Sequence, residues 1–212
     1  MKCYVNANRD ILLEPIYCDN HLLVLEKPAG IATQPDFHEI AKAWVKAKFN
    51  KPGNVFLEPI HRLDKPASGL VLFARTSKAL SRLNEAMRER KMQKFYLAKV
   101  EGHTEEEGVL EHFLVHGDFR AHVDPSGKKA VLRFRILKKT AHHSLVEIEL
   151  ETGRYHQIRV QFAAIGHPIV GDIKYGSSEK KGTIALHHHC MKISHPTTAE
   201  ELTFQSQAAF SS

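Results

Sequence analysis

The residues best suited to chemistry lie in one short segment, His61–Leu70, with the sequence HRLDKPASGL. It places a single carboxylate, Asp64, among cations and turn-forming residues, just before an apolar run typical of a buried strand. The segment is therefore predicted to be a loop at the edge of a sheet, where catalytic groups concentrate. Pro66 restricts the backbone and Gly69 permits unusual dihedrals, so both would help to hold Asp64 in place. The alternative at this point is a surface turn in which Asp64 pairs with Arg62.

Five segments, taken in order, resemble the RluA-type pseudouridine synthases. His61–Leu70 is similar to the family's HRLDxxTSG signature, with Ala67 where the family commonly has Thr. The other four resemble its Lys-Pro-x-Gly, K-x-Y-x-A and G-R-x-H-Q-[IL]-R-V segments and the turn that follows the last of these; they are Tyr17–Gly30, Lys94–Ala98, Thr152–Val160 and Gly166–Asp172. The resemblance runs from about Ile16 to Phe204, so the whole chain is expected to be one catalytic domain.

The resemblance implies an enzyme that converts uridine in RNA to pseudouridine. That reaction breaks the glycosidic bond, rotates the freed uracil and rejoins it through carbon, and it needs no redox step. Asp64 would be the nucleophile, a role that divides one difficult step into two easier ones. Arg159 would hold Asp64 in place and favour its charged form. The alternative for Arg159 is a surface cation on a helix.

Three further residues take roles from the same resemblance. Tyr96 matches the tyrosine that packs against the target base and assists proton removal at C5, although a core tyrosine is the alternative. Ile158 would form an apolar floor on the other side of the base, and an ordinary core role is equally open. Arg62 resembles the residue that fills the space of the extruded base, whose extrusion costs a few kcal/mol; a simple phosphate contact is the alternative.

Composition is consistent with a partner that carries negative charge. The chain has 212 residues, a formal net charge of +6 and a sequence pI of about 9.2, which favours phosphate contacts with RNA. No apolar stretch approaches the ~20 residues of a membrane span, and the first residues lack the apolar core of a secretion signal. We therefore expect a monomeric cytoplasmic protein with no membrane association and no obligatory protein partner.

The pattern of elements predicts an α+β fold with a mixed, mostly antiparallel, bent sheet flanked by a few helices. Helices are expected over residues 38–49, over 77–91 with Ser77 as the cap, and from Thr152 to about Ile165. Residues 103–129 are polar and irregular and are interpreted as an insertion able to grip RNA. One domain, with its core at about 16–204 and no separate N-terminal RNA-binding module, accounts for all of these elements.

A histidine run gives the main rival hypothesis. His187 and His189 would share one face of a strand, as metal ligands can, which would suit a metal-dependent hydrolase. No regularly spaced second ligand group accompanies them, and no Walker or Gly-x-Gly-x-x-Gly loop is present, so we expect neither a metal nor a nucleotide cofactor. A catalytically silent RNA-binding protein is the other rival. The favoured substrate is a structured stem-loop in rRNA, in tRNA or in both.

Overall fold

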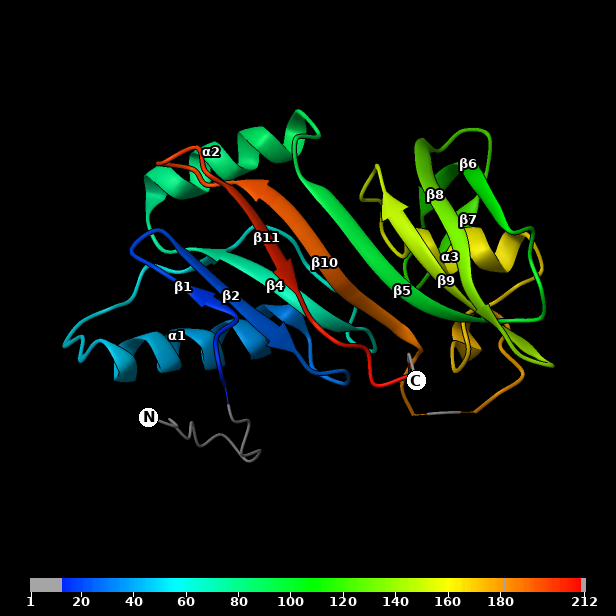
Figure 1. Ribbon diagram of the computed structural model, residues 1–212, viewed down its shortest axis with the longest axis horizontal. Helices are drawn as coiled ribbons and strands as arrows, with labels where there is room; N and C mark the ends of the chain where they lie inside the picture. The colour runs from blue at the N-terminus through cyan, green and yellow to red at the C-terminus, as the bar shows by residue number, and fades with distance from the viewer. Residues whose placement is uncertain (1–12, 181, 211–212) are drawn as a thin grey trace. The chain divides into compact units, whose positions relative to one another are not determined.

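In a computed structural model, the described residues, 13–180 and 182–210, group into two compact units. Unit 1 contains residues 13–92 and Met191–Ser206, and unit 2 contains Gln93–Cys190 and residues 207–210. Both units combine strands with helices, so the predicted α+β class is confirmed (Figure 1). Among these residues, no helix has the length and apolar character needed to cross a membrane.

Unit 1 is built on short strands with antiparallel pairing. They are β1 (Tyr17–Cys18), β2 (Leu22–Lys27), β3 (Glu58–Pro59), β4 (Ser68–Ala74), the final residues of β10 (Leu186–Ser194) and β11 (Glu201–Gln205). β2 pairs with β1 and with β4, and β3 also pairs with β4. In the β2–β4 register, Lys27 lies opposite Gly69, so the end of β2 reaches the start of β4. That register brings the Lys-Pro-x-Gly segment beside the Asp64 loop.

Two helices pack on different residues of the buried strand β4. Ala79 and Leu83, from α2 (Ser77–Arg88), share a core cluster with Leu72. Phe37, at the end of the short turn η1 (Thr33–Phe37) that leads into α1 (His38–Lys48), contacts the ring of Phe73. Adjacent strand residues point to opposite faces, so β4 is covered on both sides and forms a firm base for the loop that precedes it.

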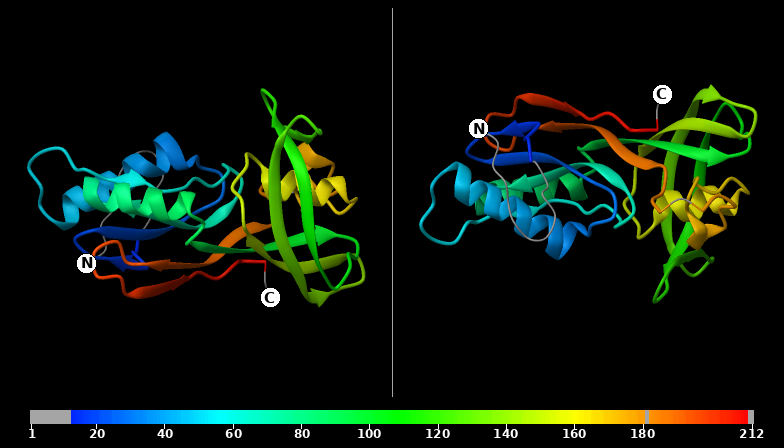
Figure 2. Two further views of the ribbon diagram at one scale, coloured as in Figure 1. Left: turned by 90° about the horizontal axis from the view of Figure 1, so that it is seen from above. Right: turned by 90° about the horizontal axis from the view of Figure 1, so that it is seen from below.

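Unit 2 is built on longer antiparallel strands. They are β5 (Gln93–Glu101), β6 (Glu107–His116), β7 (Ala121–Val123), β8 (Lys128–Lys139) and β9 (His143–Leu150), in the order β5–β9–β8–β6–β7, with the first residues of β10 beside β5. Helix α3 (Gln157–Ala164) lies against the curved strands β6 and β8 (Figure 2). Val160 of α3 packs with Leu114, Ala121 and Ala130, and a 3-10 turn, η2 (Ile173–Tyr175), follows.

Several element boundaries differ from the sequence-based predictions. The cap of α2 is Thr76, whose Oγ1 accepts from the backbone N–H of Ala79, and the helix ends at Arg88 rather than at residue 91. Helix α3 begins at Gln157 rather than near Thr152. The prediction of an irregular insertion at 103–129 is wrong, because most of that stretch forms β6, β7 and the start of β8.

Candidate active site

The Asp64 loop is held mainly through its backbone. The Oγ1 of Thr33 accepts from the N–H of Leu63 and donates to its carbonyl, both at 3.0 Å. The N–H of Gly30 donates to the carbonyl of Lys65 at 2.8 Å, and the N–H of Ala67 donates to the carbonyl of Asp64 itself at 3.1 Å. These bonds fix the backbone on both sides of Asp64, which is itself half-buried.

A fully buried lysine completes this support. The Nζ of Lys27 donates to the carbonyls of Pro28 and Ile31, each at 2.9 Å, and to that of Ala67 at 2.7 Å. Burial lowers the pKa of Lys27 from 10.5 to about 8, while the negative charge of Asp64 acts in the opposite direction and raises it. Lys27 therefore supplies both a structural link to the loop and a positive charge near Asp64.

Lys27 received no role in the sequence-based prediction, although the segment that contains it was singled out. The signal was its position at the end of an apolar strand and immediately before Pro-Ala-Gly, where the chain must turn sharply. The structure also shows what residue 67 contributes, where this chain has Ala and the family commonly has Thr. The Ala67 side chain is buried, and its contact with Lys27 is made by the backbone carbonyl, which any residue at that position would supply.

Arg62 lies on the same loop, two residues before Asp64. Arg62 is exposed, whereas Leu63, which lies between Arg62 and Asp64 in the sequence, is buried and its N–H donates to Thr33. A long cation on a fixed backbone is suited both to entering a base stack and to contacting a phosphate. Its assigned role in place of the extruded base stays a prediction.

Tyr96 lies in unit 2, on β5. Its ring stacks on His188 of β10, with 4.5 Å between centroids and 16° between planes, and only 7% of Tyr96 is exposed. Ala98 and Val100, on the same side of β5, are fully buried, as the strand alternation predicted. The stack fixes the plane of the Tyr96 ring, and its assigned role against the target base stays a prediction.

Arg159 forms a buried ion pair with a carboxylate that received no role in the sequence-based prediction. Its Nε and Nη2 donate to the two carboxylate oxygens of Asp172 at 2.6 and 2.9 Å, and the two residues are only 4% and 1% exposed. The guanidinium carbon also lies 5.0 Å from the ring centre of Tyr175. Arg159 is thus not the surface cation of the alternative interpretation. Its action on Asp64 stays a prediction.

Ile158 precedes Arg159 on α3 and is 5% exposed. The two therefore belong to a largely buried helix, together with Gln157 and Phe162. The predicted site residues are distributed over both units: Arg62 and Asp64 belong to unit 1, and Tyr96, Ile158 and Arg159 belong to unit 2. Within each unit, the predicted site residues belong to strands, helices or loops of that unit.

The histidine run is used for packing within unit 2. His188 stacks on Tyr96, and the Nε2 of His189 lies 3.3 Å from a carboxylate oxygen of Glu147. Burial lowers the pKa of His189, and Glu147 partly opposes that effect. Across residues 13–180 and 182–210, no three His, Cys, Asp or Glu side chains are grouped as metal ligands would be.

Comparison with known proteins places the chain in a family. A family model described as RNA pseudouridylate synthase matches residues 21–164, which include Asp64, Tyr96 and Arg159. The chain belongs to this family of RNA-modifying isomerases, and the RluA-type assignment made from the five motifs is confirmed.

Individual relatives agree with this assignment. The chain is 36% identical over 211 residues to the dual-specificity RNA pseudouridine synthase RluA of Haemophilus influenzae, covering 93% of this chain and 94% of that protein. It is 35% identical to the ribosomal large subunit pseudouridine synthase C of Salmonella typhimurium, covering 95% of this chain and 67% of that protein.

Solved structures support the fold. Human RNA Pseudouridylate Synthase Domain Containing 4 superposes with a TM-score of 0.79 at 21% identity, covering 92% of this chain and 88% of that one. Human RNA Pseudouridylate Synthase Domain Containing 1 gives 0.76 at 23% identity, covering 92% and 83%.

Proposed function

We propose that this pseudouridine synthase uses Asp64 as its nucleophile and acts on uridines in structured stem-loops of rRNA, tRNA or both. The observation that carries the catalytic assignment is the fixed Asp64 loop, in which Lys27 and Thr33 bind the backbone on both sides of the carboxylate. A nucleophile must be ionised and oriented. Backbone bonds orient the Asp64 residue, and the charges of Lys27 and Asp64 interact, since Asp64 raises the pKa of Lys27 against the effect of burial.

Unit 2 is proposed to supply the groups that hold the target uridine. Tyr96 packs against the base and assists removal of the C5 proton, and Ile158 forms an apolar floor. Arg159 acts on the charge of Asp64. The rigid stack of Tyr96 on His188 and the bidentate Arg159–Asp172 pair support these roles, because both reduce the reorganisation needed when substrate binds.

Arg62 is proposed to occupy the space that the target base leaves when it is extruded. Arg62 is exposed, and the backbone next to it is held by the bond from the N–H of Leu63 to Thr33. These two features suit a side chain that enters an RNA stack while the loop keeps its position. Arg62→Ala should then impair modification of a folded stem-loop more than binding to it. Equal loss of binding and modification would make Arg62 a phosphate anchor.

The names of the relatives indicate which RNA substrates to test. The named RluA relative carries dual specificity in its name and the pseudouridine synthase C relatives act on the large ribosomal subunit, so rRNA and tRNA stem-loops are the targets to test first. The net charge of +6 supports direct RNA binding by the two units acting as one catalytic domain. We propose a monomeric cytoplasmic enzyme that needs no cofactor.

The decisive test is Asp64→Asn. The amide keeps the shape and hydrogen-bonding capacity of the carboxylate but lacks the charge needed for attack. Tritium release from RNA labelled at uridine C5 should be abolished, while RNA binding and the thermal transition stay close to wild type. Asp36→Asn is the matched control, since it makes the same change at an exposed position in unit 1 and should keep full turnover.

The tested RNA is total rRNA and tRNA from cells that lack the gene, in which the target uridines are unmodified. Carbodiimide-blocked primer extension with and without the gene then identifies those uridines. If Asp64→Asn retained turnover within about tenfold of wild type, roughly 1.4 kcal/mol of barrier, a nucleophilic role for Asp64 would be untenable.

A further inference from the structure

The carboxylate that pairs with Arg159 belongs to a tight turn, residues 171–177. Within this turn, the carbonyl of Asp172 accepts from the N–H of Tyr175 at 3.0 Å and from that of Ser177 at 3.1 Å. Gly171 opens the turn with a φ of 85°, and a Cβ at this position would clash with the carbonyl of Thr183. The place of the Asp172 carboxylate therefore depends on what holds the turn.

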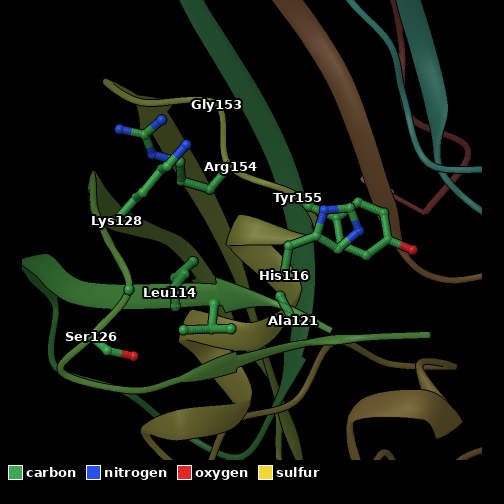
Figure 3. A pocket seen from close by; sticks show the side chains of 10 residues that line it. Leu114, His116, Ala121, Ser126, Lys128, Gly153, Arg154 and Tyr155 are labelled. Atoms are coloured by element: carbon green, nitrogen blue, oxygen red, sulfur yellow. The ribbon is translucent and has the colours of Figure 1, made fainter. Parts of the chain in front are cut away.

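The first anchor of the turn is Tyr175, whose neighbours line a pocket in unit 2 (Figure 3). The Tyr175 hydroxyl accepts from the N–H of Ala121 at 2.9 Å and lies 2.8 Å from the Nδ1 of His156. Tyr155 stacks on His156 with 3.8 Å between ring centroids, and the ring of His116 lies 4.0 Å from that of Tyr155. These packed rings fix one side of the turn.

The second anchor is Glu101, the last residue of β5. Its Oε1 accepts from the Oγ of Ser177 at 2.6 Å and from the N–H of Ser178 at 2.8 Å, and its Oε2 accepts from the Oγ of Ser178 at 2.9 Å. Burial acts to raise the pKa of Glu101, but the bonds from the two serines outweigh it and hold the pKa below its ordinary value. The turn therefore binds Glu101 as a charged carboxylate.

Ser177 connects Glu101 to the backbone around Asp172. The same Oγ that donates to Glu101 accepts from the N–H of Gly171 at 3.0 Å, and the N–H of Ser177 donates to the carbonyl of Asp172. Ser177 is buried, whereas Ser178 is exposed. A contact made by Glu101 thus reaches Asp172 through one buried side chain.

We infer that Glu101 is a positioning residue for the reaction of this enzyme. Through Ser177 it holds the turn that carries Asp172, and so keeps the Arg159–Asp172 pair in one orientation. Glu101 and Ser177 lie outside the five segments that resemble the family motifs, so those motifs assign them no role. The inference rests on the proposed function, because it acts through the role proposed for Arg159.

The test uses two pairs of variants. Glu101→Gln replaces one carboxylate oxygen with an amide nitrogen, which cannot accept a hydrogen bond. Glu105→Gln is its matched control, because it makes the same change at an exposed residue just after β5. Ser177→Ala removes the connecting hydroxyl, and Ser177→Thr keeps it.

The first measurement follows the ion pair without RNA. In protein labelled with nitrogen-15, the Nε–Hε signal of Arg159, identified by its loss in Arg159→Lys, reports the bond to Asp172. In Glu101→Gln and Ser177→Ala, this signal should shift, and exchange of its hydrogen with water should become about tenfold faster as the turn opens more often. Glu105→Gln and Ser177→Thr should resemble the wild type.

The second measurement separates turnover from binding, at a temperature at which every variant is fully folded. In Glu101→Gln and Ser177→Ala, kcat should fall about tenfold, because a misplacement of about 1 Å in a positioned group costs up to about a hundredfold. KM and the Kd for RNA should stay within about twofold, since the turn positions Arg159 rather than binding RNA.

An unchanged Arg159 signal in both Glu101→Gln and Ser177→Ala would overturn the inference. A lower thermal transition with wild-type kcat in the folded protein would also overturn it, since Glu101 would then only stabilise the fold. If Glu101→Gln does not fold, Ser177→Ala decides, with Ser177→Thr as its rescue. If the wild type forms no pseudouridine but the Arg159 signal still responds, the proposed function fails while the anchoring of the turn by Glu101 stands.

Discussion

The two halves of the predicted site are held by different kinds of bond. In unit 1, the Asp64 loop is fixed by Lys27 and Thr33 through backbone carbonyl and N–H groups. In unit 2, Arg159 is fixed through the side chains of Asp172 and Tyr175. In the Asp64 loop, one partner in each bond is a backbone group, which is present whatever the residue type, so only Lys27 and Thr33 need to be kept. The Arg159 contacts join two side chains, so a substitution on either side of a contact removes it. We therefore expect unit 2 to be more sensitive to substitution than unit 1.

The largest effect on stability is expected from Asp172→Asn. It removes the negative charge beside the buried Arg159, and an unpaired buried charge typically costs about 3–5 kcal/mol. The free energy of unfolding, measured by urea titration, should fall by that order, and turnover should fall with it.

A double variant tests whether the lost stability comes from the unpaired charge of Arg159. Arg159→Met combined with Asp172→Leu should recover much of the lost stability, since it removes both charges, but it should stay inactive. A loss below about 1 kcal/mol in Asp172→Asn would mean that the pair adds no more than an exposed ion pair does, and the contrast between the units would disappear.

Lys27→Met should have the next largest effect. It leaves the buried carbonyls of Ile31 and Ala67 without their donor, and a buried polar group without a partner costs about 1–3 kcal/mol. Turnover should fall more than RNA affinity, because the change acts on the position of Asp64. Lys42→Met, at a partly exposed lysine of α1 that pairs with Glu39, is the control and should leave both unchanged. Unchanged turnover in Lys27→Met would show that the loop holds its shape without the lysine.

A smaller effect should appear in the pH dependence of stability. The folded-state pKa of Lys27 is about 8, below its ordinary 10.5, so the unfolded chain binds the proton more strongly between these values. The cost of burying the charged amine is fully present below pH 8 and is relieved as the pH rises toward 10.5. Over that range, wild type should gain stability relative to Lys27→Met, as followed by urea titration at several pH values. Parallel pH profiles would place the pKa of Lys27 near its ordinary value.

The smallest effect is expected from Ala67→Thr, which restores the residue common in the family. The contact with Lys27 uses the backbone carbonyl of residue 67 and survives the change. Turnover should stay within about threefold of wild type, a barrier change below 1 kcal/mol. A larger gain in turnover would show that a hydroxyl at this position has a role that the backbone contacts do not replace.

Local patterns predicted the parts of the fold in which one face is clearly apolar. Strand β4 and the turn before it followed from an apolar run preceded by Pro and Gly, and α1 followed from its amphipathic spacing. Strand β6 was missed because both of its faces are partly exposed, so its sequence has no sustained apolar alternation. The start of α3 was misplaced because His156 adopts a left-handed backbone conformation, with φ of 54°, which interrupts the helix that Thr152 would otherwise begin.

The sequence predicted the candidate site residues that lie in recognisable motifs, but not the residues that contact them. Asp64, Tyr96 and Arg159 came from short segments with a recognisable order. The partners Lys27 and Asp172 did not, because their roles depend on residues distant in the chain: Lys27 needs the carbonyl of Ala67, and Asp172 lies 13 residues from Arg159. A lysine before Pro-Ala-Gly usually faces solvent, and only the folded chain shows the carbonyls that surround it.

The bonds that shape the Asp64 loop join residues far apart in sequence: 30 positions separate Thr33 from Leu63, and 40 separate Lys27 from Ala67. Closing chain segments of this length carries an entropy cost that local contacts do not offset. The geometry around Asp64 therefore cannot form in a short peptide or early in synthesis. A nascent chain that has exposed Asp64 but not yet formed the β2–β4 pair carries the proposed nucleophile without its orientation, so activity and folding of unit 1 should appear together.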